Sequence, residues 1–233
     1  MSLLDVTRTE VKYDIGPIEM ADMKRRLGIF MEPDPHNGEK GYLVRSLYFD
    51  TLHDTDFEEK VEGCDGRQKI RLRVYGAGAE TAKLEVKEKT GAFQRKRSLI
   101  LTREESMDMI GGRYRFLLRR EEPLAKWLYP FLNVRSYRPK CIVEYDRLAY
   151  ITEHNDTRIT FDQNLRASEA AFDIFCENTA LYAVSPPGQV TMEVKYTGFL
   201  LTYLKNELNH CNKTQVSNSK YCKARMISKR GRS

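Results

Sequence analysis

The residues best suited to chemistry lie in one stretch, Arg67–Arg97, with the sequence RQKIRLRVYGAGAETAKLEVKEKTGAFQRKR. The stretch holds ten Lys and Arg against three Glu, a net charge of +7 (10 − 3), whereas the whole chain carries +6. Lys69, Arg71 and Arg73 alternate with apolar residues, and a second alternating run follows at 82–89. Successive side chains of a strand point to opposite faces, so the pattern predicts strands with one cationic face and one largely apolar face.

A cationic strand face has two interpretations. In an ordinary sheet it is solvated, while the apolar face covers the core, and it has no further role. Alternatively it lines an enclosed space, because long ionic residues also stand two apart elsewhere, as in Glu10/Lys12 and Glu193/Lys195. Confined cations repel one another, so such a lining is favourable only around a polyanion. Arg and Lys suit phosphate oxygens, and scattered Glu suit Mg²⁺ or Mn²⁺.

Composition narrows the class of protein. A chain of 233 residues with 41% hydrophobic and 31% charged residues can bury a substantial core as one large domain or two small ones. No run of about 18 apolar residues occurs, and the N-terminus shows no signal-peptide core, so we expect a cytoplasmic protein without a transmembrane segment. Five scattered Cys argue against a disulfide framework or a zinc site. The pI near 9.0 favours an anionic partner.

The elements that must position these residues follow from alternation and turn signals. The capping-box sequence at 102–105 predicts a helix start, Gly28 a helix end, and the acidic run 50–65 a solvated helix or turn rather than a metal site. The expected class is α+β, mainly β: a closed eight-stranded antiparallel β-barrel with flanking helices, forming a single domain over 1–224 with a basic tail at 225–233. Strands are predicted at 6–14, 42–50, 68–76, 82–89, 92–101, 138–152, 157–162 and 189–196, and helices at 17–27, 103–111, 122–133 and 198–210.

Eight short motifs occur in an order that matches one known family. The sequence resembles a stand-alone bacterial VTC domain, the polyphosphate polymerase domain of the vacuolar transporter chaperone proteins, a triphosphate tunnel metalloenzyme related to CYTH domains. The resemblance extends from about 7 to 224. The motifs are RTEVKY, LVRSLYFDT, RQKIRLRVYG, LEVKEKTGAFQRKRS, EYDRLAY, RITFD, MEVKY and SNSKY.

This resemblance implies a metal-dependent phosphotransferase that moves the terminal phosphoryl group of ATP to a polyphosphate chain inside a basic tunnel. It implies a divalent metal, Mn²⁺ or Mg²⁺, held by Glu193 with Glu10 and Glu85 as further candidates. It implies catalytic roles for Lys12, Arg71, Arg73, Lys87, Arg147 and Glu193. The implied phosphate-binding residues are Lys12, Arg71, Arg73, Lys87, Lys96, Tyr145, Arg147, Arg158, Lys195, Ser219 and Lys220.

Two other functions remain open at this point. A hydrolase could cleave triphosphate or nucleoside triphosphate in the same tunnel, with water as the acceptor. A non-catalytic module could bind a polyanion. Nucleic acid is not the expected partner, because the cations lie in alternating strands and no RRM, KH or helix-turn-helix signature is present. The expected partners are ATP, or another nucleoside triphosphate, and inorganic polyphosphate.

Overall fold

The computed structural model describes residues 8–91 and 93–230, which form two compact units. Unit 1 comprises Met1–Leu43, Tyr145–Leu165 and Ser185–Asn218, and unit 2 comprises Val44–Glu144, Arg166–Val184 and Ser219–Ser233. Two long strands, β7 (Arg138–Thr152) and β8 (Thr157–Ser168), contribute residues to both units. Each unit contains an antiparallel sheet with an apolar face and an ionic face.

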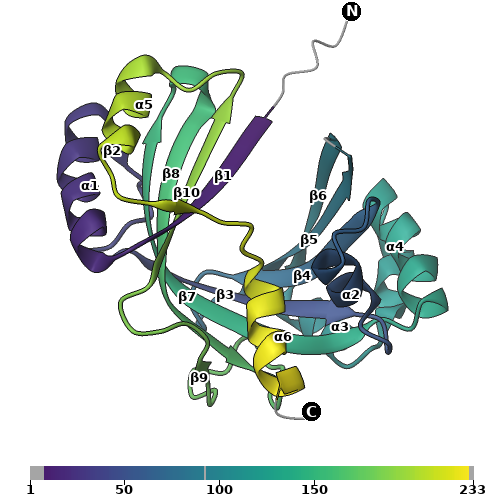
Figure 1. Cartoon of the computed structure of the whole chain (residues 1–233). Helices are drawn as coiled ribbons and strands as arrows, with labels where there is room; N and C mark the ends of the chain where they lie inside the picture. Colours follow the sequence, from purple (N-terminus) through teal and green to yellow (C-terminus); the bar gives the residue numbers. More distant parts are fainter. Residues whose placement is uncertain (1–7, 92, 231–233) are drawn as a thin grey trace, which may run out of the picture. The chain divides into compact units, whose positions relative to one another are not determined.

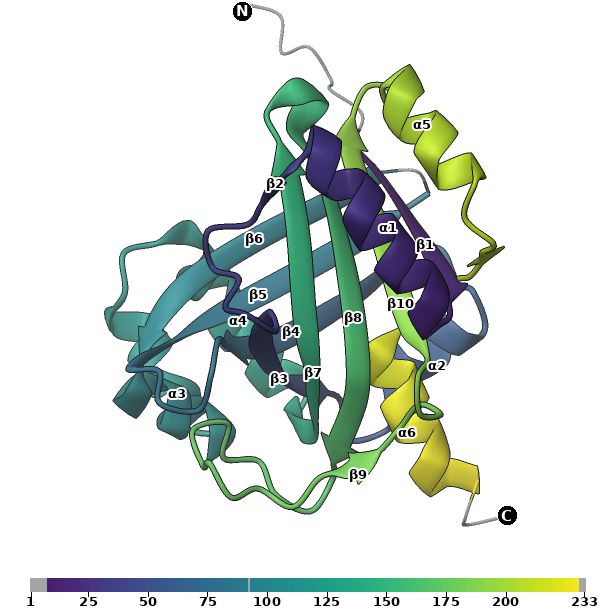
Figure 2. The same cartoon turned by 90° about the vertical axis from the view of Figure 1, so that its left-hand side faces the viewer.

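Unit 1 holds the strand order β11-β1-β10-β8-β7, with β2 paired to β7. Helices α1 and α5 cover one face of this sheet (Figures 1 and 2). Alternate residues of β10, such as Val190, Met192 and Val194, point into the core beneath these helices. The bounds are β1 Arg8–Ile15, α1 Pro17–Phe30, β2 Glu32–Pro33, η2 His154–Asp156, β10 Val190–Thr197, α5 Thr202–Asn209 and β11 Thr214–Gln215.

Unit 2 holds the order β7-β3-β4-β5-β6, with β9 paired to β8. Its apolar face includes Ile70, Leu72 and Leu84 and packs on residues of α3, η1 and α4. The bounds are β3 Tyr42–Asp50, α2 Thr55–Val61, β4 Arg67–Val74, β5 Thr81–Thr90, β6 Phe93–Thr102, α3 Arg103–Ile110, η1 Tyr114–Arg119, α4 Pro123–Val134, β9 Tyr182–Ala183 and α6 Lys220–Arg230.

The mainly β, antiparallel class with flanking helices is confirmed, but the predicted closed eight-stranded barrel is not seen. Among residues 8–91 and 93–230, the strand order is an open path of nine strands that ends at β11 and β6, and β2 and β9 pair beside this path to give eleven strands in all. Alternation and turn lengths predict that strands exist and neighbour one another. Closure depends on strand tilt and stagger, which the sequence pattern does not specify.

Several predicted boundaries differ from the observed ones for local reasons. The helix predicted to end at Gly28 continues to Phe30 as α1. Gly28 is exposed and lies within the helix, where a glycine weakens the helix without ending it. The capping box is confirmed: Thr102 Oγ1 accepts from the Glu105 amide, and the Glu105 carboxylate accepts from the Thr102 amide. Parts of the predicted strands at 6–14 and 92–101 (residues 6, 7 and 92) lie outside the described residues, as does 231–233 of the predicted tail.

The C-terminal stretch expected as a tail is helical as far as Arg230. Helix α6 buries Tyr221, Cys222 and Ala224, and its Arg225 pairs with two acids of unit 2. These three buried residues lie just before the predicted tail, and the described residues of the tail continue the helix. None of the helices in the described part of the chain is long and apolar enough to cross a membrane.

Candidate functional site

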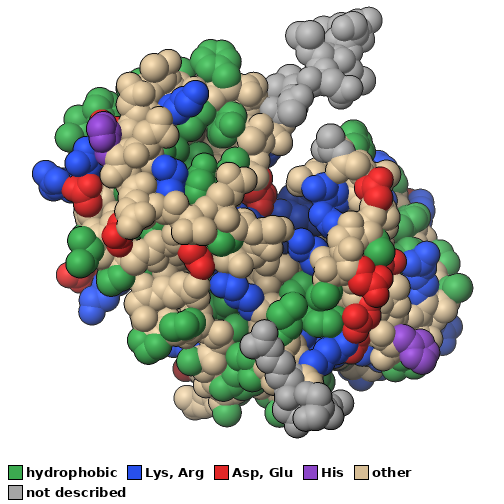
Figure 3. Space-filling view, in the orientation of Figure 1, with side chains coloured by type: hydrophobic (Ala, Val, Ile, Leu, Met, Phe, Trp, Pro, Cys, Tyr) green, Lys and Arg blue, Asp and Glu red, His purple; other side chains and the backbone are tan. Residues whose placement is uncertain are grey.

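The strand register of unit 2 brings the cationic residues of three strands onto one face. Lys69 stands opposite Lys87, and Lys87 stands opposite Lys96. Like charges directly opposite each other destabilise a sheet, so a row of three ammonium groups favours an anionic ligand. Lys and Arg side chains gather over β5 and β6 in the space-filling view (Figure 3). We call the following six residues the unit-2 cluster: Lys69, Arg71, Arg73, Glu85, Lys87 and Lys96.

Glu85 is the one acid of the unit-2 cluster, and three cations surround it. Its Oε2 lies 2.7 Å from Arg71 Nη2 and 3.7 Å from Arg73 Nη1, while Lys96 contacts Oε1. The side chain is 1% exposed. Burial alone would raise the pKa of Glu85, but the charges of Arg71, Arg73 and Lys96 outweigh burial and hold that pKa well below its ordinary value. Glu85 is therefore ionised and fixes the direction of the Arg71 guanidinium.

Hydroxyl groups of β3 hold the opposite side of the two arginines. Arg71 Nη1 donates to the Tyr48 hydroxyl at 3.0 Å, and Arg73 Nε donates to Ser46 Oγ at 3.3 Å. These contacts follow from the register, because Tyr48 stands opposite Arg71 and Ser46 opposite Arg73. A hydroxyl of β3 and the carboxylate of Glu85 on β5 thus position each guanidinium from both neighbouring strands, which reduces the conformational entropy lost when it binds an anion.

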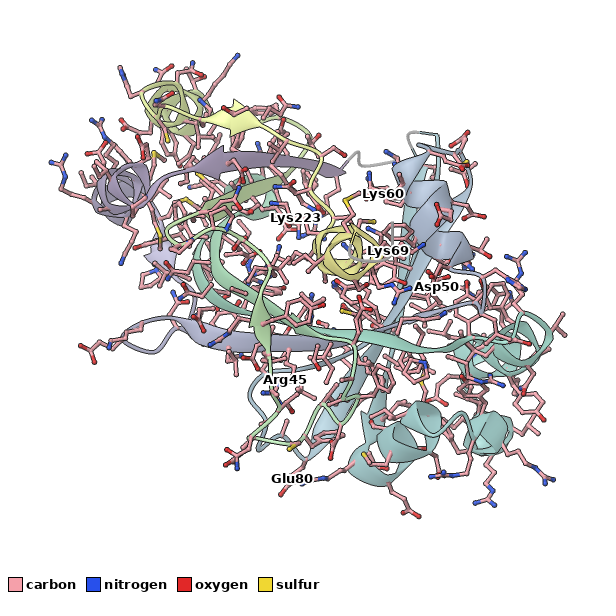
Figure 4. All side chains as sticks on the ribbon, turned by 60° about the horizontal axis from the view of Figure 1, so that its bottom comes forward. Arg45, Asp50, Lys60, Lys69, Glu80 and Lys223 are labelled. Carbon is pink, nitrogen blue, oxygen red and sulfur yellow. The ribbon has the colours of Figure 1, made fainter. Side chains whose placement is uncertain are left out.

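The start of α6 brings Ser219 and Lys220 to unit 2. Lys69 Nζ donates to Ser219 Oγ at 2.8 Å, beside the first turn of α6 (Figure 4). The same Oγ accepts from the Cys222 amide at 3.3 Å, so Ser219 caps the helix. Lys220 is the first residue of the helix. The structure therefore joins the predicted Ser219 to the cationic row through Lys69.

Unit 1 contains a second group of alternating charges. Lys12 stands opposite Glu193, and Glu10 stands opposite Lys195. Lys12 Nζ lies 3.1 Å from Glu10 Oε1 and 3.5 Å from Glu193 Oε2. Lys195 contacts Glu193 Oε1 and lies 3.6 Å from Glu10 Oε2. We call these four residues, Glu10, Lys12, Glu193 and Lys195, the unit-1 cluster.

Arg147 lies on β7, which is separated from β10 by β8 in unit 1, and a carboxylate holds its side chain. Its Nε and Nη2 donate to the two oxygens of Asp162 at 2.6 and 2.8 Å. Its guanidinium carbon lies 5.3 Å from the centre of the Tyr145 ring. Burial would lower the pKa of Arg147, but Asp162, Tyr145 and Glu193 raise it well above the ordinary value. Arg147 is thus a permanently charged group whose bidentate edge already binds Asp162.

Arg158 is also held by an acid that the sequence did not single out. Its Nη2 lies 2.7 Å from Asp34 Oδ2 and donates to the Tyr42 hydroxyl at 2.8 Å. Asp34 belongs to the loop after β2, and its Oδ1 accepts from the His36 amide at 2.9 Å. Burial would raise the pKa of Asp34, but the hydrogen bonds from His36 and the charge of Arg158 hold that pKa below the ordinary value.

The carboxylates suit a divalent metal unequally. No group of three or more His, Cys, Asp or Glu gathers as a metal site within residues 8–91 and 93–230. Glu10 and Glu193 fit Mg²⁺ or Mn²⁺, because these ions accept one or two carboxylates together with waters and substrate phosphates. Lys12 and Lys195 occupy the space between the two carboxylates and would have to turn towards the phosphates. The described contacts of Glu85 are to cations, so its predicted metal role stays a prediction.

Sequence reasoning found most of the residues that the structure gathers, but it missed their partners. Unit 2 brings together five of the predicted residues, Arg71, Arg73, Glu85, Lys87 and Lys96, and Ser219 and Lys220 stand there at the start of α6. Unit 1 brings together Glu10, Lys12, Glu193 and Lys195, and it also holds the strands that carry Tyr145, Arg147 and Arg158. Their roles stay predictions. Tyr48, Lys69 and Asp34 were absent from the predicted site residues. Lys69 was visible in the alternating run, whereas only the strand register identifies Tyr48.

The chain is thus an antiparallel β protein with two clusters of closely placed ionic groups, and a comparison with protein families identifies its family. The model of the VTC domain family matches residues 7–229. The protein therefore belongs to the VTC domain family.

Other comparisons add information on the fold alone. No curated protein matches this chain in sequence. A putative adenylate cyclase from Bacillus halodurans is similar in structure, with a TM-score of 0.50, 12% identity, and coverage of 91% of this chain and 96% of that chain. A putative adenylate cyclase from Vibrio parahaemolyticus gives a TM-score of 0.44 at 13% identity, covering 88% and 84%. A Pyrococcus horikoshii protein gives 0.45 at 12% identity, covering 95% and 99%.

Proposed function

We propose that this VTC-domain protein is a polyphosphate polymerase that transfers the terminal phosphoryl group of ATP to a polyphosphate chain. The observation that carries the proposal is the unit-2 cluster. The cluster combines five Lys and Arg with one buried acid, Glu85, and three of its Lys form one cross-strand row. A chain of linked phosphates supplies the negative charge that such a face lacks.

Phosphoryl transfer depends chiefly on positioning and on stabilising charge at the transferring group. Arg71 and Arg73 bind the triphosphate oxygens, and Lys87 and Lys96 neutralise the charge that remains. Glu85 and the β3 hydroxyls keep the two guanidinium groups in place before the substrate arrives. This arrangement needs no Ser, Cys or His nucleophile, because the terminal phosphate of the polymer is itself the attacking group.

The residues of unit 1 have proposed roles of their own. Lys12 and Lys195 bind phosphate oxygens when they leave their carboxylates, and Ser219 and Lys220 of unit 2 bind further phosphates. Arg147 and Tyr145 supply fixed charge and a hydroxyl, and Arg158 contributes another cation. Glu193 and Glu10 would hold Mn²⁺ or Mg²⁺, which supplies Lewis-acid stabilisation of phosphate oxygens when bound. We place the reaction in the cytoplasm, where ATP is available.

The test is incubation of the full chain with ATP, Mn²⁺ and a short polyphosphate primer, followed by gel separation of the products. The proposal expects a ladder of chains that lengthens with time. The Arg71→Ala/Arg73→Ala variant should give no ladder while keeping the circular dichroism spectrum of the wild type. Arg25→Ala, on the exposed face of α1, is the matched control and should be fully active. Release of orthophosphate without a ladder would overturn the proposal in favour of the hydrolase.

A further inference from the structure

Tyr48 occupies the face of the unit-2 cluster although its sequence position gives no hint of this. It stands opposite Arg71 in the β3–β4 pairing, so the two side chains share a face. Its neighbour on the same face, two residues earlier, is Ser46, which binds Arg73. The ring is nearly buried, with 6% of the residue exposed. An apolar strand position would hold Phe here as readily, so the hydroxyl group requires an explanation.

The hydrogen bonds of that hydroxyl are incomplete. A phenol donates one hydrogen bond and accepts others. Arg71 Nη1 donates to the Tyr48 oxygen at 3.0 Å, and a guanidinium cannot accept in return. In the described part of the chain, residues 8–91 and 93–230, the Tyr48 hydrogen has no acceptor. Buried donors usually have a partner, so the geometry calls for an acceptor supplied from outside the chain.

The position of the Tyr48 ring is fixed by residues behind it. The ring stacks on Tyr221 of α6, with 5.0 Å between centroids and 20° between planes. Tyr221 in turn donates its hydroxyl to Asp50 Oδ2 at 2.8 Å, and Phe57 packs edge-on against it. Asp50 also accepts from the amides of Asp56 and Phe57, which ties the start of α2 to the same network. Such support keeps a binding group in one orientation.

The electrostatic surroundings make the hydroxyl a stronger donor towards an anion. Burial would raise the pKa of Tyr48, but the nearby charges of Arg71, Arg73 and Lys69 outweigh burial and lower it. A phenol in a cationic field gives up its hydrogen more readily. It therefore makes a shorter, charge-assisted hydrogen bond to an anionic oxygen.

We propose that Tyr48 is a substrate-binding residue that donates its hydroxyl hydrogen to a phosphate oxygen held by Arg71. This inference rests on the proposed function, because it assumes that the unit-2 cluster binds a chain of phosphates. Arg71 then acts twice: it binds the phosphate directly, and it orients the Tyr48 oxygen so that the hydrogen points away from the guanidinium. The contact adds a neutral donor where a further cation would increase the repulsion within the cluster.

The first experiment measures tripolyphosphate binding by calorimetry for the wild type and for Tyr48→Phe. The variant keeps the stacked ring and removes only the hydroxyl. Loss of one charge-assisted hydrogen bond should weaken binding about tenfold. Tyr114→Phe is the matched control, because Tyr114 is buried in the same unit and donates to the Tyr137 carbonyl at 2.6 Å. It should lower the thermal midpoint while leaving the affinity for tripolyphosphate unchanged. Equal affinity of Tyr48→Phe and the wild type would overturn the inference.

A second measurement keeps the hydroxyl in place, so it does not depend on the folding of Tyr48→Phe. 3-Fluorotyrosine is incorporated at position 48 alone, and its ionisation is followed by fluorine NMR with and without tripolyphosphate. A phosphate oxygen at the hydroxyl disfavours the phenolate, so the ligand should move the ionisation to higher pH. An ionisation that stays in place, or moves to lower pH, while tripolyphosphate is bound would show that the phosphate does not contact Tyr48.

The outcomes separate the two proposals. If tripolyphosphate binds, Tyr48→Phe binds more weakly and no polymer forms from ATP, the role of Tyr48 stands and the polymerase proposal fails. If polymer forms and Tyr48→Phe binds as the wild type does, the polymerase proposal stands and Tyr48 has no binding role. If the wild type does not bind tripolyphosphate, both proposals fail.

Discussion

Glu85 on β5 binds Arg71 on β4, with 2.7 Å between Glu85 Oε2 and Arg71 Nη2, and this pair lies among the other Lys and Arg of the unit-2 cluster. The single carboxylate offsets part of the repulsion when no ligand is bound and still leaves a large positive excess for an anion. It also holds Arg71 in one direction. Stability and binding are therefore linked through Glu85, which gives the first two predictions.

Glu85→Gln should destabilise the protein by about 3 kcal/mol near neutral pH, because it leaves buried cations without their carboxylate. Added tripolyphosphate should recover much of this loss, since a ligand that binds the folded state stabilises it. Thermal midpoints with and without tripolyphosphate check the prediction. Glu88→Gln, which breaks a half-buried pair with Arg97 on the opposite face, is the control. An equal gain from tripolyphosphate in both variants would contradict the special role of Glu85.

Acid should remove the contribution of Glu85 to the stability of the wild type, whereas the Glu85→Gln variant has no such contribution to lose. The pKa of Glu85 is held below the ordinary value of 4.5 in the folded state. The stabilisation is therefore complete above about pH 4.5 and is lost as the pH falls through the lower pKa of the folded state. Urea midpoints should drop more steeply below about pH 4.5 in the wild type than in Glu85→Gln. Parallel curves for the two proteins would show that Glu85 is not preferentially ionised in the folded state.

Asp56 should have the opposite pH dependence. Burial, together with the charge of Asp50, raises the pKa of Asp56 from 3.8 to about 8. Between these values the folded state keeps a proton that the unfolded state has lost, so the contribution of Asp56 to stability falls as the pH rises from about 4 to about 8. In Asp56→Asn this decline should shrink by an amount on the order of a few kcal/mol. Urea titrations across this range check the prediction.

The exposed Glu121, which is paired only with Lys126 among the described residues, provides the control for Asp56. Glu121→Gln should leave the pH profile unchanged. If Asp56→Asn keeps the full decline of stability up to about pH 8, then another group causes it, with Asp50 as the first alternative, because burial also raises the pKa of Asp50.

Asp34 should affect phosphate binding only through Arg158. Asp34→Asn weakens the 2.7 Å contact to Arg158 Nη2, and we expect the affinity for tripolyphosphate to fall severalfold. In an Arg158→Ala background the same substitution should have almost no further effect, because residues that act as a unit are not additive. A four-protein binding cycle by calorimetry measures this coupling. Additive losses would mean that Asp34 supports the loop rather than the arginine.

Glu193→Gln should lower turnover more than substrate binding, if Glu193 holds the metal. The amide keeps the size of the side chain and a possible contact with Lys195, but it binds Mn²⁺ or Mg²⁺ more weakly. We expect a decrease of at least tenfold in kcat with a smaller change in KM, and the decrease should lessen as Mn²⁺ is raised. Equal and slight changes in both constants would remove Glu193 from the metal role.

Much of the fold could be predicted from alternation and turn residues. The observed β3 and β7, Tyr42–Asp50 and Arg138–Thr152, coincide with the predicted 42–50 and 138–152. Both segments are rich in β-branched and aromatic residues, which favour strands. The predicted end of α1 at Gly28 was wrong, because an exposed glycine weakens a helix without ending it. The alternating pattern could not predict whether the sheet closes into a barrel, because closure depends on strand tilt and stagger, and alternation does not report them.

The candidate site could likewise be predicted from the sequence only in part. Charge at every second position identified Arg71, Lys87 and Glu193, since the side chains of one strand face share an environment. The partner of each charge depends on which strands neighbour each other and in which register. The Arg158–Asp34 contact joins a strand to a loop more than a hundred residues away, and only the folded chain brings the two together.

The stoichiometry of ATP turnover tests the central proposal most directly. The full chain is incubated with ATP, Mn²⁺ and a polyphosphate primer, and ADP, orthophosphate and polymer-bound phosphate are measured at the same time points. Polymerase activity predicts one polymer-bound phosphate for each ADP and almost no orthophosphate. One orthophosphate for each ADP, with the primer unchanged in length, would contradict the proposal.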